Sequence, residues 1–288
     1  MWTRHKAVIV VAAVIVLAGL VTGVLFALLG GQAKNASATP SDTAELRSPF
    51  TGEPVRVLNP VLAVKIDNIV HARPQTGLTH ADIVYVLPVE GGLSRFLAIF
   101  SSGYPPVVGP VRSAREDDLQ VLRQFGRPAF AYSGATPALL ADAHGASKAS
   151  DIGFRFGPLP AGGRSVPSYS ASYPAASFTF RWSAKDARWL VWMDGAAAHA
   201  TEGGQLSAPT VVIQYTKVRT SRFLEAGTRP PYAESTRTGT GVVLRGGQAY
   251  AIRWSRPDAN GATTFTTASG QPMTSAPGPV WVVLTAAP

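Results

Sequence analysis

Charged residues interrupt apolar strands in five consecutive segments of this chain: V-K-I-D-N at 64–68, A-R-P-Q-T-G-L at 72–78, A-D-I-V-Y at 81–85, V-E-G-G-L-S-R-F at 89–96 and G-P-V-R-S-A-R at 109–115. An unpaired buried charge costs several kcal/mol or shifts its pKa, so such residues must find partners. We therefore predict that these charged side chains meet around one shared site. The residues expected to form it are Asp67, Glu90, Arg95 and Arg112.

The apolar runs around these charges predict strands at 61–66, 83–89 and 93–101. Glu90-Gly91-Gly92 joins the last two as a hairpin turn, because glycine tolerates positive φ. Ser113-Ala114-Arg115-Glu116 predicts a helix start capped by Ser113. The C-terminal third alternates apolar strands with Gly and Pro turns. The order of elements predicts an α+β fold, with a mixed sheet and helices first and a β-rich C-terminal domain second.

The first forty residues predict a membrane anchor. Arg4-His5-Lys6 precedes an apolar run at 7–29, whose 23 residues reach roughly 34 Å as a helix. A hydrocarbon core is about 30 Å thick, whereas the apolar core of a signal peptide has only about 7–15 residues. We expect one retained transmembrane helix with its basic flank in the cytoplasm and the rest outside. Cleavage after Ala38, in the sequence Ala36-Ser37-Ala38, is the alternative.

These signals divide the chain into five parts. They are a cytoplasmic flank at 1–6, a transmembrane anchor at 7–30, a flexible tether at 31–47, an N-terminal α+β domain at 48–180 with a Gly/Ser/Pro-rich loop at 145–177, and a β-rich C-terminal domain at 181–288.

Composition narrows the function classes. The chain has no cysteine, which excludes disulfides, thiol catalysis and a lipid-modified cysteine. Its net charge is +9, which predicts general attraction to anionic envelope surfaces. Nucleic acid is not an expected partner because the domains face outward. The five histidines have no metal-ligand spacing, so we expect neither a metal site nor a cofactor.

The charged residues allow three interpretations. Arginines clamp carboxylates or phosphates through two parallel hydrogen bonds, and the candidates here are Arg73, Arg95, Arg112 and Arg115. Alternatively, Glu90 with Asp67 or Asp117 supplies the two carboxylates of glycoside cleavage. The third interpretation is that the ion pairs only close the fold.

The same five segments resemble the signature of the YerB-like envelope proteins, a bacterial family named as lipoproteins and classed as a domain of unknown function. G-Q-A-Y-A-I-R-W-S-R at 247–256 and G-P-V-W-V-V-L at 278–284 resemble the family's smaller C-terminal domain. The resemblance implies a membrane-attached, outward-facing protein with two domains and no assigned catalytic residues. The family's lipid-carrying cysteine is absent here, and the predicted helix takes its place.

We conclude from the sequence that this is an extracytoplasmic, membrane-anchored protein that binds an envelope component. Peptidoglycan, a wall polymer or a membrane-bound wall-synthesis protein is the expected partner. Binding is predicted to centre on Glu90, Arg95 and Arg112, with Asp67, Arg115 and Arg73 in support. An enzyme that acts on wall glycan or peptide, with Glu90 as acid or base, is one alternative, and catalysis is less favoured than binding. A passive protein–protein scaffold is the other.

Overall fold

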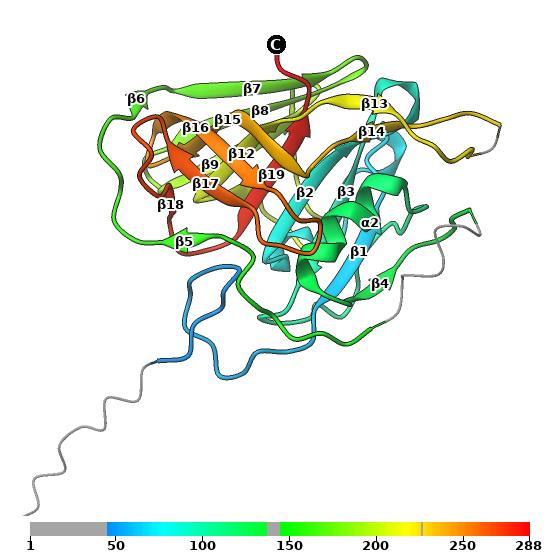
Figure 1. Ribbon diagram of the computed structural model, residues 1–288, viewed down its shortest axis with the longest axis horizontal. Coiled ribbons are helices and arrows are strands. Elements are labelled where there is room, and N and C mark those ends of the chain that lie inside the picture. Colours follow the sequence, from blue (N-terminus) through cyan, green and yellow to red (C-terminus); the bar gives the residue numbers. More distant parts are fainter. Residues whose placement is uncertain (1–44, 137–144, 226) are drawn as a thin grey trace, which may run out of the picture. The chain divides into compact units, whose positions relative to one another are not determined.

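A ten-stranded sheet built from both halves of the chain forms the centre of the fold (Figure 1). The computed structural model describes residues 45–136, 145–225 and 227–288. In spatial order the strands are β17 (Thr264–Thr267), β16 (Gln248–Arg256), β15 (Arg237–Arg245), β12 (Thr210–Tyr215), β19 (Val280–Thr285), β2 (Ile83–Pro88), β3 (Ser94–Phe100), β1 (Leu62–Ile66) and β4 (Ala129–Ala131), and β6 (Arg164–Ser165) pairs with β16.

The two halves of the chain join where β19 pairs with β2. The pairing is parallel and runs from Val280 opposite Ile83 to Val283 opposite Val86. On its other side β19 pairs in parallel with β12, so the last strand of the chain lies in the middle of the sheet. Both faces of β2 and β19 are buried, which agrees with their nearly continuous apolar sequences.

A second, five-stranded sheet packs against the first. Its strands are β10 (Ala196–Ala197), β9 (Arg188–Met193), β8 (Ala176–Ser183) and β7 (Ser168–Tyr173), with β11 (Ser207–Ala208) pairing with β9. Two small sheets complete the strands: β13 (Val218–Thr220) with β14 (Pro231–Ala233), and β5 (Arg155–Phe156) with β18 (Thr274–Ser275). The predicted domain boundary at 180 lies within β8, and the division into domains stays a prediction.

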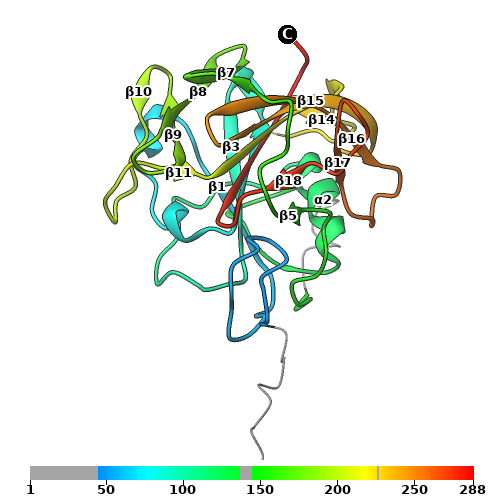
Figure 2. The same ribbon diagram turned by 90° about the vertical axis from the view of Figure 1, so that its left-hand side faces the viewer.

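One α-helix, α2 (Glu116–Leu122), occurs in the described ranges. The short 3-10 turns are η1 (Val70–Ala72), η2 (Leu78–His80), η3 (Glu90–Gly92) and η4 (Arg123–Phe125). Figure 2 shows α2 on one side of β1 and β3, with β8 and β9 on the other.

Each face of the ten-stranded sheet covers its own apolar core. The first core contains alternate residues of the strands, such as Tyr85 and Leu97. They pack against Val121 of α2 and Phe125 of η4. The second core contains the intervening residues and is closed by the five-stranded sheet. Its aromatic members are Phe96, Phe100, Tyr173, Phe178, Phe180, Trp189 and Trp281.

The α+β fold predicted from the sequence is wrong, because the regular secondary structure of the described residues is mostly β-strand in both halves of the chain. The Gly/Ser/Pro-rich stretch at 145–177, expected to be a surface loop, contributes β5, β6 and β7 and places Ile152 and Phe154 in the first core. Its short strands lack the long apolar runs on which strand prediction depends.

The predicted helix start was also misplaced. The helix begins at Glu116, and Arg115 rather than Ser113 is its N-cap. Asp118, not Glu116, accepts the backbone N–H of the N-cap residue, at 2.7 Å. The chain therefore stays extended past Ser113, which places Arg112 and Arg115 before the helix.

The anchor predicted at 7–30 lies outside the described residues. Within residues 45–136, 145–225 and 227–288, no helix has the length and apolar character needed to cross a membrane.

Trp281 tests the core between the two sheets. Its ring packs edge-on against Phe96 at 5.6 Å and Phe180 at 6.2 Å between ring centroids. Because Trp281→Ala leaves a large cavity, it should lower the free energy of unfolding by about 3–5 kcal/mol in urea titrations. Trp192→Ala is the matched control, since Trp192 lies half-buried under Arg181 and should cost about 1 kcal/mol. Equal losses would contradict the two-core description.

Candidate functional site

Six side chains of alternating charge follow one another at the end of β1 and the start of β3, and we call them the charge ladder. Their order is Arg112, Asp67, Arg95, Glu90, Arg115 and Glu225. The joining distances are 3.2 Å from Arg112 Nε to Asp67 Oδ2, 3.8 Å from Asp67 Oδ1 to Arg95 Nε, 4.0 Å from Arg95 Nη2 to Glu90 Oε2, 2.6 Å from Glu90 Oε1 to Arg115 Nε and 3.7 Å from Arg115 Nη1 to Glu225 Oε2.

The backbone brings these residues together. Asp67 directly follows β1, Arg95 lies at the start of β3, and Glu90 lies in the turn between β2 and β3. The N–H of Arg112 donates to the carbonyl of Lys65 at 2.8 Å, so the segment before α2 runs along the end of β1. Asp67 and Arg112, which are 45 positions apart in the sequence, therefore lie at the same end of the sheet.

A buried ion pair fixes the ladder to the sheet. Lys65 Nζ lies 2.6 Å from Asp118 Oδ1, and both side chains are 0% exposed. The other oxygen of Asp118 accepts the N–H of Arg115, the N-cap of α2. Carboxylates in the first turn of a helix also interact favourably with the helix dipole. The pair therefore holds the first turn of α2 against β1.

Asp117 lies next to this pair, and its carboxylate has no hydrogen-bond partner among the described residues. Its side chain is fully buried, and neither carboxylate oxygen has a partner. Burial, followed by the negative charge of Asp118, raises the pKa of Asp117 to about 8, although Lys65 acts in the opposite direction. Asp117 is therefore mostly protonated at neutral pH.

Arg95 is loosely held in the ladder. It is buried, and both of its carboxylate neighbours lie beyond hydrogen-bond distance. Nη1 donates to the carbonyl of Ser113 at 3.3 Å, while Nε has no hydrogen-bond partner among the described residues. Burial and then the nearby charge of Arg115 lower the pKa of Arg95. A desolvated guanidinium with an unused donor is suited to receive an anion.

Glu90 is ionised in this arrangement. Burial opposes ionisation, but the hydrogen bond and charge of Arg115, with Arg95, lower the pKa of Glu90 below its usual value. Oε1 is bonded to Arg115, and Oε2 is buried without a hydrogen bond. A carboxylate held by a guanidinium is a poor general acid, so this geometry favours binding over acid–base chemistry.

The structure brings five of the six predicted site residues together: Asp67, Glu90, Arg95, Arg112 and Arg115. Arg73 lies beside the ladder but is not part of it, because its Nη1 pairs with Asp194 at 2.8 Å and its other nitrogens donate to Asn68, the residue after Asp67. Sequence reasoning missed Glu225, which reaches the ladder from the other half of the chain. No local pattern around Glu225 signals this contact.

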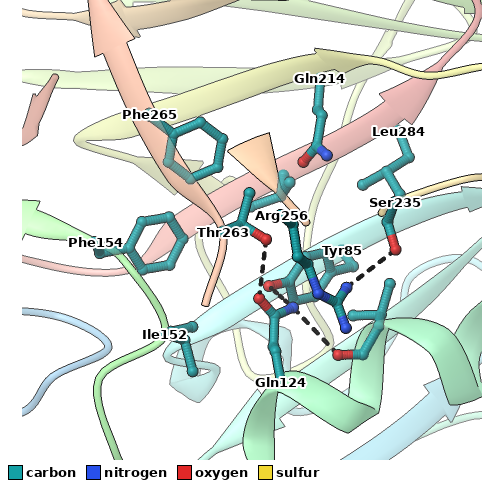
Figure 3. A pocket seen from close by; sticks show the side chains of 12 residues that line it. Tyr85, Gln124, Ile152, Phe154, Gln214, Ser235, Arg256, Thr263, Phe265 and Leu284 are labelled. Atoms are coloured by element: carbon teal, nitrogen blue, oxygen red, sulfur yellow. Dashed lines mark hydrogen bonds between the residues drawn. The ribbon is translucent and has the colours of Figure 1, made fainter. Parts of the chain in front are cut away.

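The enclosed cavity under α2 is a separate feature, and it is too small for a substrate. Its volume is about 10 Å³, close to the minimum for one water molecule. Figure 3 shows the Arg256 guanidinium at this cavity between Gln124 and Ser235. Arg256 is fully buried and donates to Ser235 Oγ at 3.1 Å and to the carbonyls of Gly261 and Gln120. These bonds tie α2 to the C-terminal strands.

The described part of the chain contains no group of three or more His, Asp or Glu side chains arranged to hold a metal ion.

A mostly β protein, with one sheet shared by two consecutive halves and a charge ladder at the sheet's end, is the class that these observations define. Family models match both halves. "Protein of unknown function (DUF3048) N-terminal domain" matches residues 50–154, and the corresponding C-terminal domain matches residues 168–282. The chain belongs to this family, which confirms the YerB-like resemblance.

Comparisons of sequence and of structure with YerB of Bacillus subtilis support the assignment. "Putative lipoprotein YerB" of Bacillus subtilis (strain 168) is 47% identical over 97 residues, which are 32% of this chain and 28% of that protein. The matched part thus spans less than a third of the relative. The crystal structure of the YerB protein from Bacillus subtilis has a TM-score of 0.69 at 22% identity, covering 84% of this chain and 97% of the other. At that identity the likeness shows the fold alone.

Asp117 predicts a specific pH dependence. Its pKa rises on folding from 3.8 to about 8, so the folded state binds more protons than the unfolded state between those values. Stability should therefore fall as pH rises across this window. Urea unfolding at pH 5, 6, 7 and 8 should show wild type losing stability relative to Asp117→Asn at each step. A difference that stays constant with pH would contradict the protonated, buried state of Asp117.

Arg256 predicts a large stability effect. Arg256→Met leaves buried carbonyls without their charged donor, and such hydrogen bonds contribute about 1.5–3 kcal/mol each. We expect the free energy of unfolding to fall by about 3 kcal/mol in urea titrations. Arg253→Met, on the exposed side of the same strand, should change it by less than about 0.5 kcal/mol. A small effect at Arg256 would mean that water replaces the guanidinium without cost.

Proposed function

We propose that this protein is attached to the membrane, faces outward, and binds an anionic component of the cell envelope through the charge ladder. The ligand presents a carboxylate or phosphate group of peptidoglycan or another wall polymer. Arg95 and Arg112 receive the anion with Arg115 in support, while Asp67 and Glu90 position these arginines.

The loose contacts of Arg95 carry this proposal. Ion pairs that only close a fold are expected to use short, bidentate geometry, because separation beyond hydrogen-bond distance forfeits part of the gain that offsets desolvation. The 3.8 and 4.0 Å separations around Arg95, and its unused Nε donor, favour a residue available to an incoming anion.

Arg112 provides the approach from solvent. Its side chain is 49% exposed, whereas Asp67, its partner, is 8% exposed. Only the Arg112 end of the pair is exposed, and the Asp67 carboxylate also accepts the N–H of Asn68 at 2.9 Å, so Asp67 keeps a hydrogen bond when Arg112 turns to a ligand. Residues 39–288 keep 23 of the 26 Lys and Arg and all 17 Asp and Glu, a net charge of +6, which would also increase the rate of encounter with an anionic polymer.

Membrane attachment is supported by the apolar run at 7–29 and by the name of the relative "Putative lipoprotein YerB". A wall-synthesis protein in the membrane remains an alternative partner. Catalysis on wall glycan or peptide is not favoured by the ionised, arginine-bound state of Glu90.

Co-sedimentation with intact cell-wall sacculi tests the proposal. The full chain, purified in detergent, should bind sacculi at moderate salt, and Arg112→Ala should weaken binding roughly tenfold, as expected for loss of a charged hydrogen bond of about 1.4 kcal/mol. Because Arg112 is half exposed, the variant should keep its thermal unfolding temperature.

Arg155→Ala is the matched control, since Arg155 is 51% exposed and also pairs with an aspartate, Asp151. It should bind as wild type does. Equal weakening by both variants, or wild-type binding that disappears with salt alone, would leave only general charge attraction and refute the proposed site.

A further inference from the structure

We infer that Glu225 occupies the position of the ligand's carboxylate in the charge ladder, and that a carboxylate of the wall polymer displaces it from Arg115. This inference rests on the proposed function and names the chemical class of the ligand. Glu225 would then be an internal competitor, supplied by the C-terminal half to a site built by the N-terminal half.

The contact between Glu225 and Arg115 is weak. Glu225 Oε2 lies 3.7 Å from Arg115 Nη1, outside hydrogen-bond distance. Its other oxygen, Oε1, is buried and has no partner among the described residues. A desolvated carboxylate gains little from such geometry, because burial costs more than a distant cation returns. Exchange for a better-placed carboxylate would therefore be favourable.

The segment that carries Glu225 is held at a different point. Glu116 accepts the hydroxyl of Ser221 at 2.6 Å and the N–H of Arg222 at 3.1 Å, and its Oε1 lies 3.0 Å from Arg222 Nε. These bonds attach the segment to the first turn of α2 near Ser221. Glu225 can therefore leave Arg115 while the Glu116 contacts stay intact.

The charges of the ladder select the class of ligand. Three arginines face three carboxylates, so the complete ladder is neutral. Without Glu225 it carries one positive charge, which one ligand carboxylate neutralises. Glu225 is itself a carboxylate, so a carboxylate of the polymer replaces it with the same charge and the same planar group. Arg115 already donates through Nε to Glu90 Oε1 and through Nη1 to the carbonyl of Ala114. The ligand carboxylate therefore meets this guanidinium as Glu225 does, without a bidentate contact to Nε and Nη1.

The test compares three variants of the full chain on intact sacculi. Glu225→Gln removes the competing charge, and Glu225→Asp shortens the side chain at constant net charge. Glu234→Gln is the matched control, because Glu234 lies in the same region but pairs with Arg219 at 2.7 Å. Thermal unfolding confirms that each variant is folded. Two further sacculus preparations are used. In one the carboxylates are amidated, and in the other the polymer phosphates are removed with hydrofluoric acid.

We expect Glu225→Gln to bind native sacculi roughly threefold or more tightly than wild type, which corresponds to loss of one weak competing ion pair. Glu225→Asp should show a smaller gain, and Glu234→Gln none. The gain should persist after phosphate removal and disappear on amidated sacculi.

Three results would overturn the inference: no gain for Glu225→Gln, an equal gain for Glu234→Gln, or a gain that survives amidation and is lost with the phosphates. If wild type binds and Arg112→Ala does not, such a result refutes the role of Glu225 alone. If no protein binds any sacculi, the proposed function fails as well.

Discussion

The buried ion pair between Lys65 and Asp118 holds the start of α2 against β1, and the arrangement of the charge ladder depends on it. Two fully buried charges are stable only as partners, since removing one leaves the other uncompensated at a cost of about 3–5 kcal/mol. Asp118 also accepts the backbone N–H of Arg115, the N-cap of α2. The pair therefore sets where the helix begins. The position of the helix start in turn places Arg112 and Arg115 beside Asp67 and Glu90.

The shared sheet adds a second constraint. β19 pairs in parallel with β2, so the C-terminal strands cannot separate from the N-terminal strands without breaking this pairing. The Arg256 hydrogen bonds to α2 reinforce this junction. This arrangement allows Glu225, from the second half, to reach a site that the first half builds. The two sequence domains therefore act as one structural unit at the ladder.

Local sequence patterns predicted the strands and the grouping of charges, but not the fold class. The hairpin at Glu90-Gly91-Gly92 has two glycines at positive φ, at 70° and 73°, as its sequence indicated. Charged residues within apolar strands correctly indicated that Arg95 and Asp67 lie near each other, because buried charges need partners. The places of Arg73 and Glu225 depend on contacts with distant segments, which no local pattern encodes.

The central claim is that Arg95 receives an anionic ligand. The most direct test follows the Nε–H resonances of the arginine side chains by NMR during titration with soluble wall fragments, with Arg95→Lys used for assignment. The account predicts that the Arg95 resonance shifts in a saturable way and that its Nε–H exchanges more slowly with water. Shifts confined to exposed arginines such as Arg155, with Arg95 unchanged, would show that the ladder serves only to close the fold.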